Sequence, residues 1–217
     1  EKNTFYKCKS LTEIELPSSI LSIDEYAFCN CFSLSEIIIP SSVESLGEYA
    51  FKGCKNLSKM TMDPNHTKIC SNSFEDCVSC HELNIISDSC TLKEIPFNIK
   101  SVSISKTIKC IGENSFSNCS YLTNITIPSS TTEICENAFV NCVSLEQIII
   151  PSSVTKIGAS AFKNGSSLTK VDIQSIIIQT IDSFAFNGCK SLKQFVIPTS
   201  VAVIGKHSFS KCSSLNC

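Results

Sequence analysis

The feature that most constrains this chain is a unit of about 23 residues that recurs along its whole length. Phenylalanine marks the phase of the unit at positions 5, 28, 51, 74, 116, 139, 162, 186 and 209. The 42 residues between Phe74 and Phe116 are interpreted as a 19-residue unit followed by a 23-residue unit, with Lys93 in the phenylalanine position. A unit this short cannot bury a core alone, so the copies must stack with like side chains in contact.

The shared pattern predicts the local structure of each unit. The segment "FCNCFSLSEIIIPSSVESLGEYA" from Phe28 and the segment "FVNCVSLEQIIIPSSVTKIGASA" from Phe139 are nearly the same. The I-x-I alternation predicts a short strand, for example at 35–39, 123–127 and 146–150, and the following proline ends it. The V-x-x-I step is a candidate for a second short strand. The segment that begins at Gly47 is predicted to form a single helical turn.

These elements predict a β-rich solenoid. We expect a right-handed leucine-rich-repeat superhelix of about nine units, with one continuous parallel sheet and short helical turns on the other side. Residues 1–217 are expected to form one solenoid domain, with units phased at Phe5, Phe28, Phe51, Phe74, Lys93, Phe116, Phe139, Phe162, Phe186 and Phe209.

The two ends of the chain stop within a unit. This predicts that the chain is a piece of a longer array and that copies associate end to end. It also predicts unusual exposure of five apolar side chains in the terminal units, namely Phe5, Ile14, Leu16, Phe209 and Leu215.

Charge and hydropathy exclude two classes of partner. The formal net charge is -2, which gives no electrostatic reason to expect nucleic acid. No apolar run approaches the ~18 residues of a membrane span, so we expect no membrane contact by these residues. The first residues, Glu-Lys-Asn-Thr, show no signal peptide.

Cysteine is abundant, and most of it follows the repeat. Of the 15 cysteines, eight lie three residues after the phenylalanine position: Cys8, Cys31, Cys54, Cys77, Cys119, Cys142, Cys189 and Cys212. The favoured interpretation is a structural ladder of free thiols in dry turns. A chain of disulfides along the ladder is disfavoured because parallel Cβ vectors oppose the dihedral angle that a disulfide requires, and one cysteine per coil gives no tetrahedral metal site.

The segment "CVSCH" at 77–81 has the form of a haem attachment sequence or half of a zinc site. The repeat favours a structural interpretation, because Cys77 belongs to the ladder, Cys80 occupies a core leucine position, and His81 occupies an exposed position. The three histidines lie at different offsets in different units. We therefore predict no catalytic residue, no metal site and no cofactor.

The candidate ligand-binding surface is the outer face of the predicted sheet. Two columns of side chains point outward from the strands, and they vary while the core columns are uniform. Ile38, Ile149 and Val196 are candidate apolar anchors; the alternative is a plain solvated face. The candidate residues are Glu13, Glu15, Glu36, Ile38, Lys59, Thr61, Glu82, Asn84, Asn124, Thr126, Gln147, Ile149, Lys170, Asp172, Gln194 and Val196.

The unit L-x-x-I-x-I-P-x-S-V-x-x-I-G-x-x-A-F-x-x-C resembles the BspA-like, or Treponema pallidum type, leucine-rich repeat over essentially the whole chain. The resemblance implies a non-enzymatic protein-binding module of a cell-surface or extracellular protein. It also implies adhesion to host extracellular matrix or to a cell-surface protein. Two alternatives stay open: an intracellular scaffold for protein–protein interaction, and a module joined to a catalytic domain elsewhere in the protein.

Overall fold

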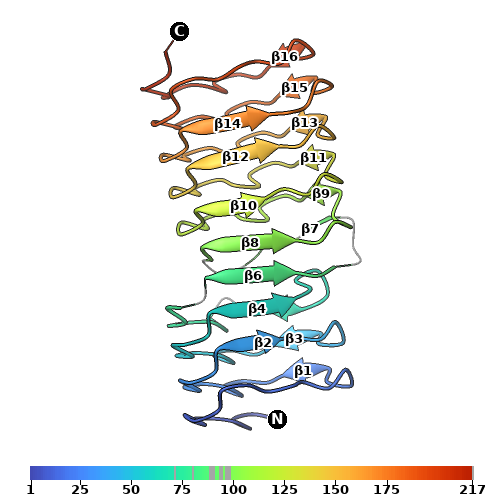
Figure 1. The fold of residues 1–217 in the computed structure, drawn as a ribbon, viewed down its shortest axis with the longest axis vertical. Coiled ribbons are helices and arrows are strands. Elements are labelled where there is room, and N and C mark those ends of the chain that lie inside the picture. Colours follow the sequence, from blue (N-terminus) through green and yellow to red (C-terminus); the bar gives the residue numbers. More distant parts are fainter. Residues whose placement is uncertain (71, 80, 88–90, 93–94, 96–98, 217) are drawn as a thin grey trace. The chain divides into compact units, whose positions relative to one another are not determined.

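The protein is a β-solenoid of about seven turns of ~23 residues with parallel strands (Figure 1). The computed structural model describes residues 1–70, 72–79, 81–87, 91–92, 95 and 99–216. The chain divides into two compact units, Glu1–Ser87 and Asp88–Cys217, and each is described by itself.

In the first unit, two parallel ladders of strands run through successive coils. The longer strands are β2 (Glu36–Ile38), β4 (Lys59–Met62) and β6 (Glu82–Ile85), paired in the order β2–β4–β6. The shorter strands are β1 (Ser22–Ile23), β3 (Ser45–Leu46) and β5 (Lys68–Ile69), paired in the order β1–β3–β5. Each residue of these strands pairs with the residue 23 positions further along the chain, as the repeat predicts.

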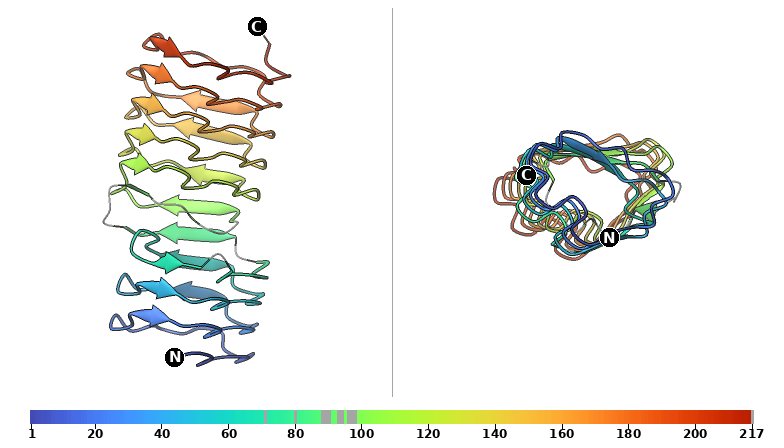
Figure 2. Two further views of the ribbon diagram at one scale, coloured as in Figure 1. Left: turned by 180° about the vertical axis from the view of Figure 1, so that it is seen from behind. Right: turned by 90° about the horizontal axis from the view of Figure 1, so that it is seen from below.

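The second unit continues the same plan. Its longer strands are β8 (Ser101–Ile104), β10 (Asn124–Thr126), β12 (Gln147–Ile150) and β14 (Lys170–Ile173), with β8 paired to β10 and β12 to β14. Its short ladder runs through β7 (Thr91–Leu92), β9 (Cys110–Ile111), β11 (Glu133–Ile134), β13 (Lys156–Ile157), β15 (Thr180–Ile181) and β16 (Val203–Ile204). Figure 2 shows the long and short strands on different sides of each coil.

The V-x-x-I step forms the second short strand for which it was a candidate, as in β3 and β13, so each unit carries two parallel ladders. The predicted number of units is wrong. The structure has about seven turns instead of nine. Residues 12–16 and 193–197 have the repeat pattern but are not strands. They belong to the first and last coils, which have a neighbour on one side only.

The core is a set of columns of identical side chains. In the first unit, the rings of Phe5, Phe28, Phe51 and Phe74 stack at centroid separations of 5.0–5.1 Å and nearly parallel planes. In the second unit, the rings of Phe116, Phe139, Phe162, Phe186 and Phe209 stack at 5.2–5.5 Å. The strand residues alternate between buried and exposed, so Ile37 and Ile148 lie in the core while Ile38 and Ile149 face outward.

The segment around each phenylalanine is a turn and not the predicted helical turn. No helix is present among the residues that the structure describes. In most coils the residues two before and two after the phenylalanine have a positive φ, as in Tyr26 and Asn30 or Asn137 and Asn141. The non-glycine φ values lie between 54° and 62°. A left-handed residue cannot continue a right-handed helix, so the chain turns twice in this segment.

The strand register contains two irregular steps, at the two places where the phenylalanine spacing departs from 23. Thr91 lies opposite Cys110, a step of 19 residues, and Lys156 lies opposite Thr180, a step of 24. Lys93, the predicted phase mark of the short unit, lies outside the described residues. Ile95 has the bonding of the phenylalanine position: it is buried, and its N–H donates to the carbonyl of Ser115, as Phe116 N–H donates to Ala138. The phenylalanine position of this coil is therefore two residues later than predicted, 21 residues from both Phe74 and Phe116.

The predicted exposure of the terminal coils is confirmed. Phe5, Ile14, Leu16, Phe209 and Leu215 are only partly buried. Their counterparts one coil inward, Phe28, Ile37, Ile39, Phe186 and Leu192, are at most 2% exposed. A side chain in an outer coil has a stacking neighbour on one side only, which leaves part of its surface in water.

Candidate binding face and cysteine columns

The candidate surface is the strand face, defined as the outward side chains of the longer strands. In the first unit, Glu36, Ile38, Lys59 and Glu82 are exposed, and Thr61 and Asn84 are half-exposed. The backbone register places Glu36 and Glu82 on either side of Lys59. Because the charges alternate along this column, neighbouring side chains attract each other and the column carries a small net negative charge.

In the second unit the strand face is mostly uncharged and contains a hollow. The hollow has a volume of about 310 Å³ and is lined chiefly by residues of β10, β12 and the turns that follow these strands. Asn124, Thr126, Gln147 and Ile149, which the sequence placed in the two outward columns, all line it. Gln174 lies at the same site. The lining combines amide and hydroxyl groups with apolar residues, of which Ile149 is the exposed one. Such a mixed lining suits a group that is partly polar and partly apolar.

The remaining candidates are less uniform. Lys170 is exposed on β14, and Asp172 on the same strand is half-exposed. Glu13, Glu15, Gln194 and Val196 are exposed but lie in segments that are not strands. Of the three candidate apolar anchors, Ile38 is 60% exposed, Ile149 is 54% exposed and Val196 is 81% exposed.

The cysteine ladder has a defined hydrogen-bonding role in the structure. The thiol of Cys54 donates to the carbonyl of Phe28 in the preceding coil, with Sγ 3.1 Å from the oxygen. The same bond joins Cys31 to Phe5, Cys77 to Phe51, Cys142 to Phe116, Cys189 to Phe162 and Cys212 to Phe186. Cys8, in the first coil, is exposed, and Cys119 is buried. Each of these carbonyls also accepts a backbone N–H within its own turn, as Phe28 accepts from Cys31, so the thiol supplies a second hydrogen bond that joins neighbouring coils.

Burial makes the ladder thiols poor nucleophiles. Desolvation raises the pKa of Cys31 to about 11 and that of Cys189 to about 12. It also raises the pKa of Cys142. The thiolate is the reactive and metal-binding form of cysteine, and these sites disfavour it. These thiols are therefore less reactive than an exposed cysteine.

The segment at 77–81 follows the repeat where it is described. Cys77 bonds to the carbonyl of Phe51, as its ladder counterparts do, and His81 is exposed and joined by its N–H to Ser58. Cys80 lies outside the described residues. Of the other histidines, His66 bonds through Nδ1 to the buried Asp63 at 2.7 Å, and His207 lies against the ring of Phe184. Each of these contacts is local to its own part of the solenoid.

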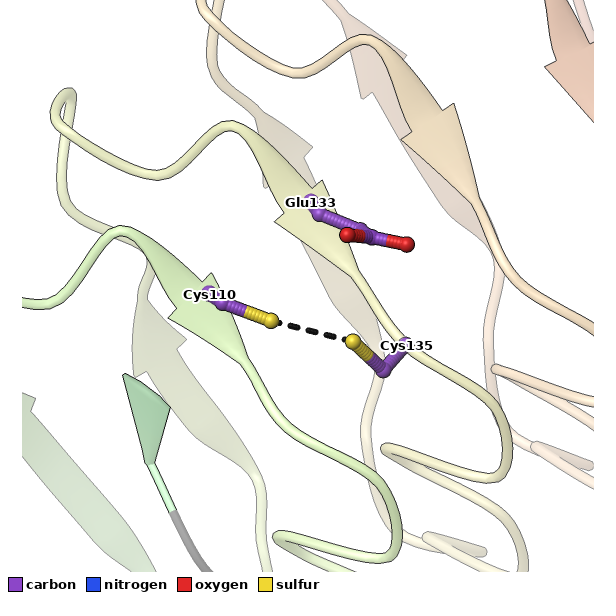
Figure 3. Close-up of side chains that lie close together, drawn as sticks. All are labelled: Cys110, Glu133 and Cys135. Atoms are coloured by element: carbon purple, nitrogen blue, oxygen red, sulfur yellow. Dashed lines mark hydrogen bonds between the residues drawn. The ribbon is translucent and has the colours of Figure 1, made fainter. Parts of the chain in front are cut away.

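One group of reactive side chains was missed in the sequence. Cys110, Glu133 and Cys135 come from neighbouring coils, and their ligand atoms lie within 4.8 Å of one another (Figure 3). None of the three belongs to the ladder. A signal was available: Cys135 stands four residues before its phenylalanine, where Gly47, Gly112, Gly158 and Gly205 stand in other coils. Glycine is used there because the coils approach closely, and a Cβ on Gly158 would lie 2.7 Å from the carbonyl carbon of Cys135.

In the part of the chain that the structure describes, no helix has both the length and the apolar character needed to cross a membrane.

Short coils stacked in register, with leucine and isoleucine columns inside and a parallel strand face outside, define a leucine-rich repeat protein. The chain belongs to the BspA type of these proteins. The family model described as "BspA type Leucine rich repeat region (6 copies)" matches residues 1–98 and 93–216.

Several solved structures are similar to the chain. A leucine-rich repeat protein of T. pallidum has 25% sequence identity and a TM-score of 0.48, covering 93% of this chain and 76% of that one. A leucine-rich repeat protein of Bacteroides ovatus has 22% identity and a TM-score of 0.41, covering 99% and 74%. A leucine-rich cell surface protein of Faecalibacterium prausnitzii has 18% identity and a TM-score of 0.40, covering 94% and 85%. No curated protein matches the chain.

Proposed function

We propose that the chain is a non-enzymatic protein-binding module of a cell-surface protein, and that its strand face binds a protein of the host matrix or of a host cell. The observation that carries the proposal is the contrast between the two sides of each strand. Inward positions of the strands are apolar in every coil, whereas outward positions change in chemical character from coil to coil and are exposed or half-exposed. Variation confined to one face is the arrangement that solenoids use to recognise protein ligands.

The hollow between β10 and β12 is the centre of the proposed interface. It offers Gln147 and Asn124 as hydrogen-bonding groups around the exposed side chain of Ile149. A partner that inserts an apolar side chain here would bury Ile149 and displace water from the hollow. Burial of an exposed isoleucine contributes roughly 1.5–3 kcal/mol at most. The location at the cell surface and the role in adhesion rest on membership of the BspA-type family.

A binding experiment with two matched variants tests the proposal. The purified chain is passed over immobilised fibronectin and other matrix proteins, and over host cells. We expect saturable binding that Ile149→Lys weakens by about tenfold or more. Ile176→Lys is the control, because Ile176 is 83% exposed but lies outside the strand face. Equal loss of binding in both variants, or cytosolic localisation of the full protein with no binding to matrix or cells, would remove the adhesion proposal.

The proposal also includes the finer architecture that the sequence predicts: a right-handed superhelix in one domain, together with end-to-end association of copies. Exposed apolar side chains of the last coils support the association, among them Val196, Val203 and Ile204. Small-angle scattering distinguishes an elongated solenoid from a compact shape. Sedimentation over a range of concentrations tests the association, and a strict monomer up to ~100 µM would contradict it.

A further inference from the structure

Cys110 and Cys135 face each other across neighbouring coils of the second unit. Cys110 is the first residue of β9, and Cys135 directly follows β11 (Figure 3). The register sets Cys110 opposite Glu133, so that Cys135 lies two residues further along the next coil. The two Sγ atoms are 3.0 Å apart, and the residues are separated by 25 positions in the sequence.

These thiols differ from those of the ladder in their partners. Six of the ladder thiols donate to a phenylalanine carbonyl, as Cys142 does to Phe116. Cys110 and Cys135 instead contact each other, and both are half-buried at a position between the core and the solvent. A small reagent can therefore reach them. Burial is the main cause that raises the pKa of Cys135, and contact with Cys110 raises it further.

The surroundings favour a bond between the sulfurs over a bound metal. Only three ligand atoms gather among the described residues, and one of them belongs to Glu133. That carboxylate is already joined to the ammonium of Lys156, with Nζ 3.3 Å from Oε1. A cation here would compete with Lys156 for Glu133 and would be repelled by the lysine charge. Oxidation of the two thiols needs neither the carboxylate nor a fourth ligand.

We propose that Cys110 and Cys135 form a reversible disulfide that links two neighbouring coils. In the reaction, one cysteine thiolate attacks a sulfur of a low-molecular-weight disulfide such as oxidised glutathione and expels one glutathione thiolate. The second cysteine, after losing its proton to water, attacks the protein sulfur of this mixed disulfide and expels the second glutathione. The two cysteines are oxidised, and one oxidised glutathione is reduced to two molecules of glutathione.

The neighbouring coils show that this position is used to tie coils together. Glu133 and Lys156 stand opposite each other one coil further on and form the ion pair described above. Between the coils of Cys110 and Cys135, the disulfide would supply a covalent link where the next pair of coils has a solvent-screened ion pair. Because the bond closes a loop in the unfolded chain, it raises the stability of the folded state. The link would hold under oxidising conditions and open under reducing conditions.

The test uses the full chain and oxidised glutathione. Wild-type protein, first reduced and then freed of reductant, is incubated with oxidised glutathione, alkylated and digested. We expect a linked pair of peptides that contains Cys110 and Cys135, a mass lower by two hydrogen atoms, and a Tm higher by roughly 5–10 °C. A thiol reductant should reverse all three changes.

Matched variants assign the link. Cys110→Ser and Cys135→Ser should abolish the linked peptides and the rise in Tm. Cys70→Ser is the control: Cys70 occupies the equivalent position in another coil, where Ser45 stands in place of the partner thiol. If a variant does not fold, peptide mapping of the wild-type chain still decides the question. The proposal would be overturned if Cys110 and Cys135 could both still be alkylated after oxidation. It would also be overturned if the pair held stoichiometric zinc in the reduced protein.

Discussion

Replacing Phe139 by alanine removes one ring from the middle of a stack and tests whether the phenylalanine column holds the coils together. The Phe139 side chain is fully buried, and its ring lies 5.2 Å from the rings of both Phe116 and Phe162. A buried Phe→Ala change costs about 3–5 kcal/mol through lost transfer energy and a cavity. Two ring contacts are lost here, so we expect a loss near the upper end of that range.

The same change at the end of the stack supplies the comparison. Phe5 is only partly buried and stacks on Phe28 at 5.0 Å. Phe5→Ala should therefore reduce the free energy of unfolding by about 1–2 kcal/mol, since part of the ring is already in water. Phe139→Leu keeps most of the volume and should cost less than about 2 kcal/mol.

Urea unfolding followed by circular dichroism measures all three variants. Because solenoids can unfold in parts, the transition should also be followed by hydrogen exchange in each unit. If Phe139→Ala costs under about 1 kcal/mol, or if Phe5→Ala costs as much, the stack is not the main support of the coils and the argument from burial is wrong.

The remaining predictions concern the turns and the thiols. Stability should fall as pH rises from 9 toward 12, because the folded state holds the Cys189 proton with a pKa of about 12 against an ordinary value of 9.0. The stability that Cys189 contributes through its proton is fully present below pH 9. Above pH 9, the urea midpoint of Cys189→Ala should fall less steeply with pH than that of the wild-type protein. Asn141→Ala should cost roughly 1–2 kcal/mol, measured by urea unfolding, because Asn141 has a φ of 61° and bonds to Asn118 and Asn164; Asn141→Gly should cost less. Ser45→Cys should create a second link, to Cys70, detectable by peptide mapping after oxidation, since Ser45 and Lys68 pair as Cys110 and Glu133 do; two free thiols there would contradict the geometric argument.

The periodic features of the fold could be predicted from the sequence, and the reason is physical. In a solenoid each residue contacts its own copy one coil away, so the spacing of Phe116, Phe139 and Phe162 in the sequence is also their order in space. The same reasoning placed Ile37 inside and Ile38 outside, located the strands of the inner coils, and gave the 19-residue and 24-residue steps. The family followed from the same pattern and is matched over nearly the whole chain.

Only the tertiary structure decided two kinds of feature. One is contacts between residues that occupy different positions in the repeat unit, and the other is features that depend on backbone angles. The left-handed residues such as Asn137 and Asn141 convert the expected helical turn into two tight turns, because φ is set by the path between coils. The ladder thiols find their acceptors 26 or 27 residues earlier, one coil away. The contact of Cys110 with Cys135 spans 25 residues, two more than the repeat, so a search along columns does not find it. Sequence periodicity determines which side chains stack. Contacts between different positions of the repeat, and hollows on the surface, depend instead on the displacement between neighbouring coils and on side-chain rotamers.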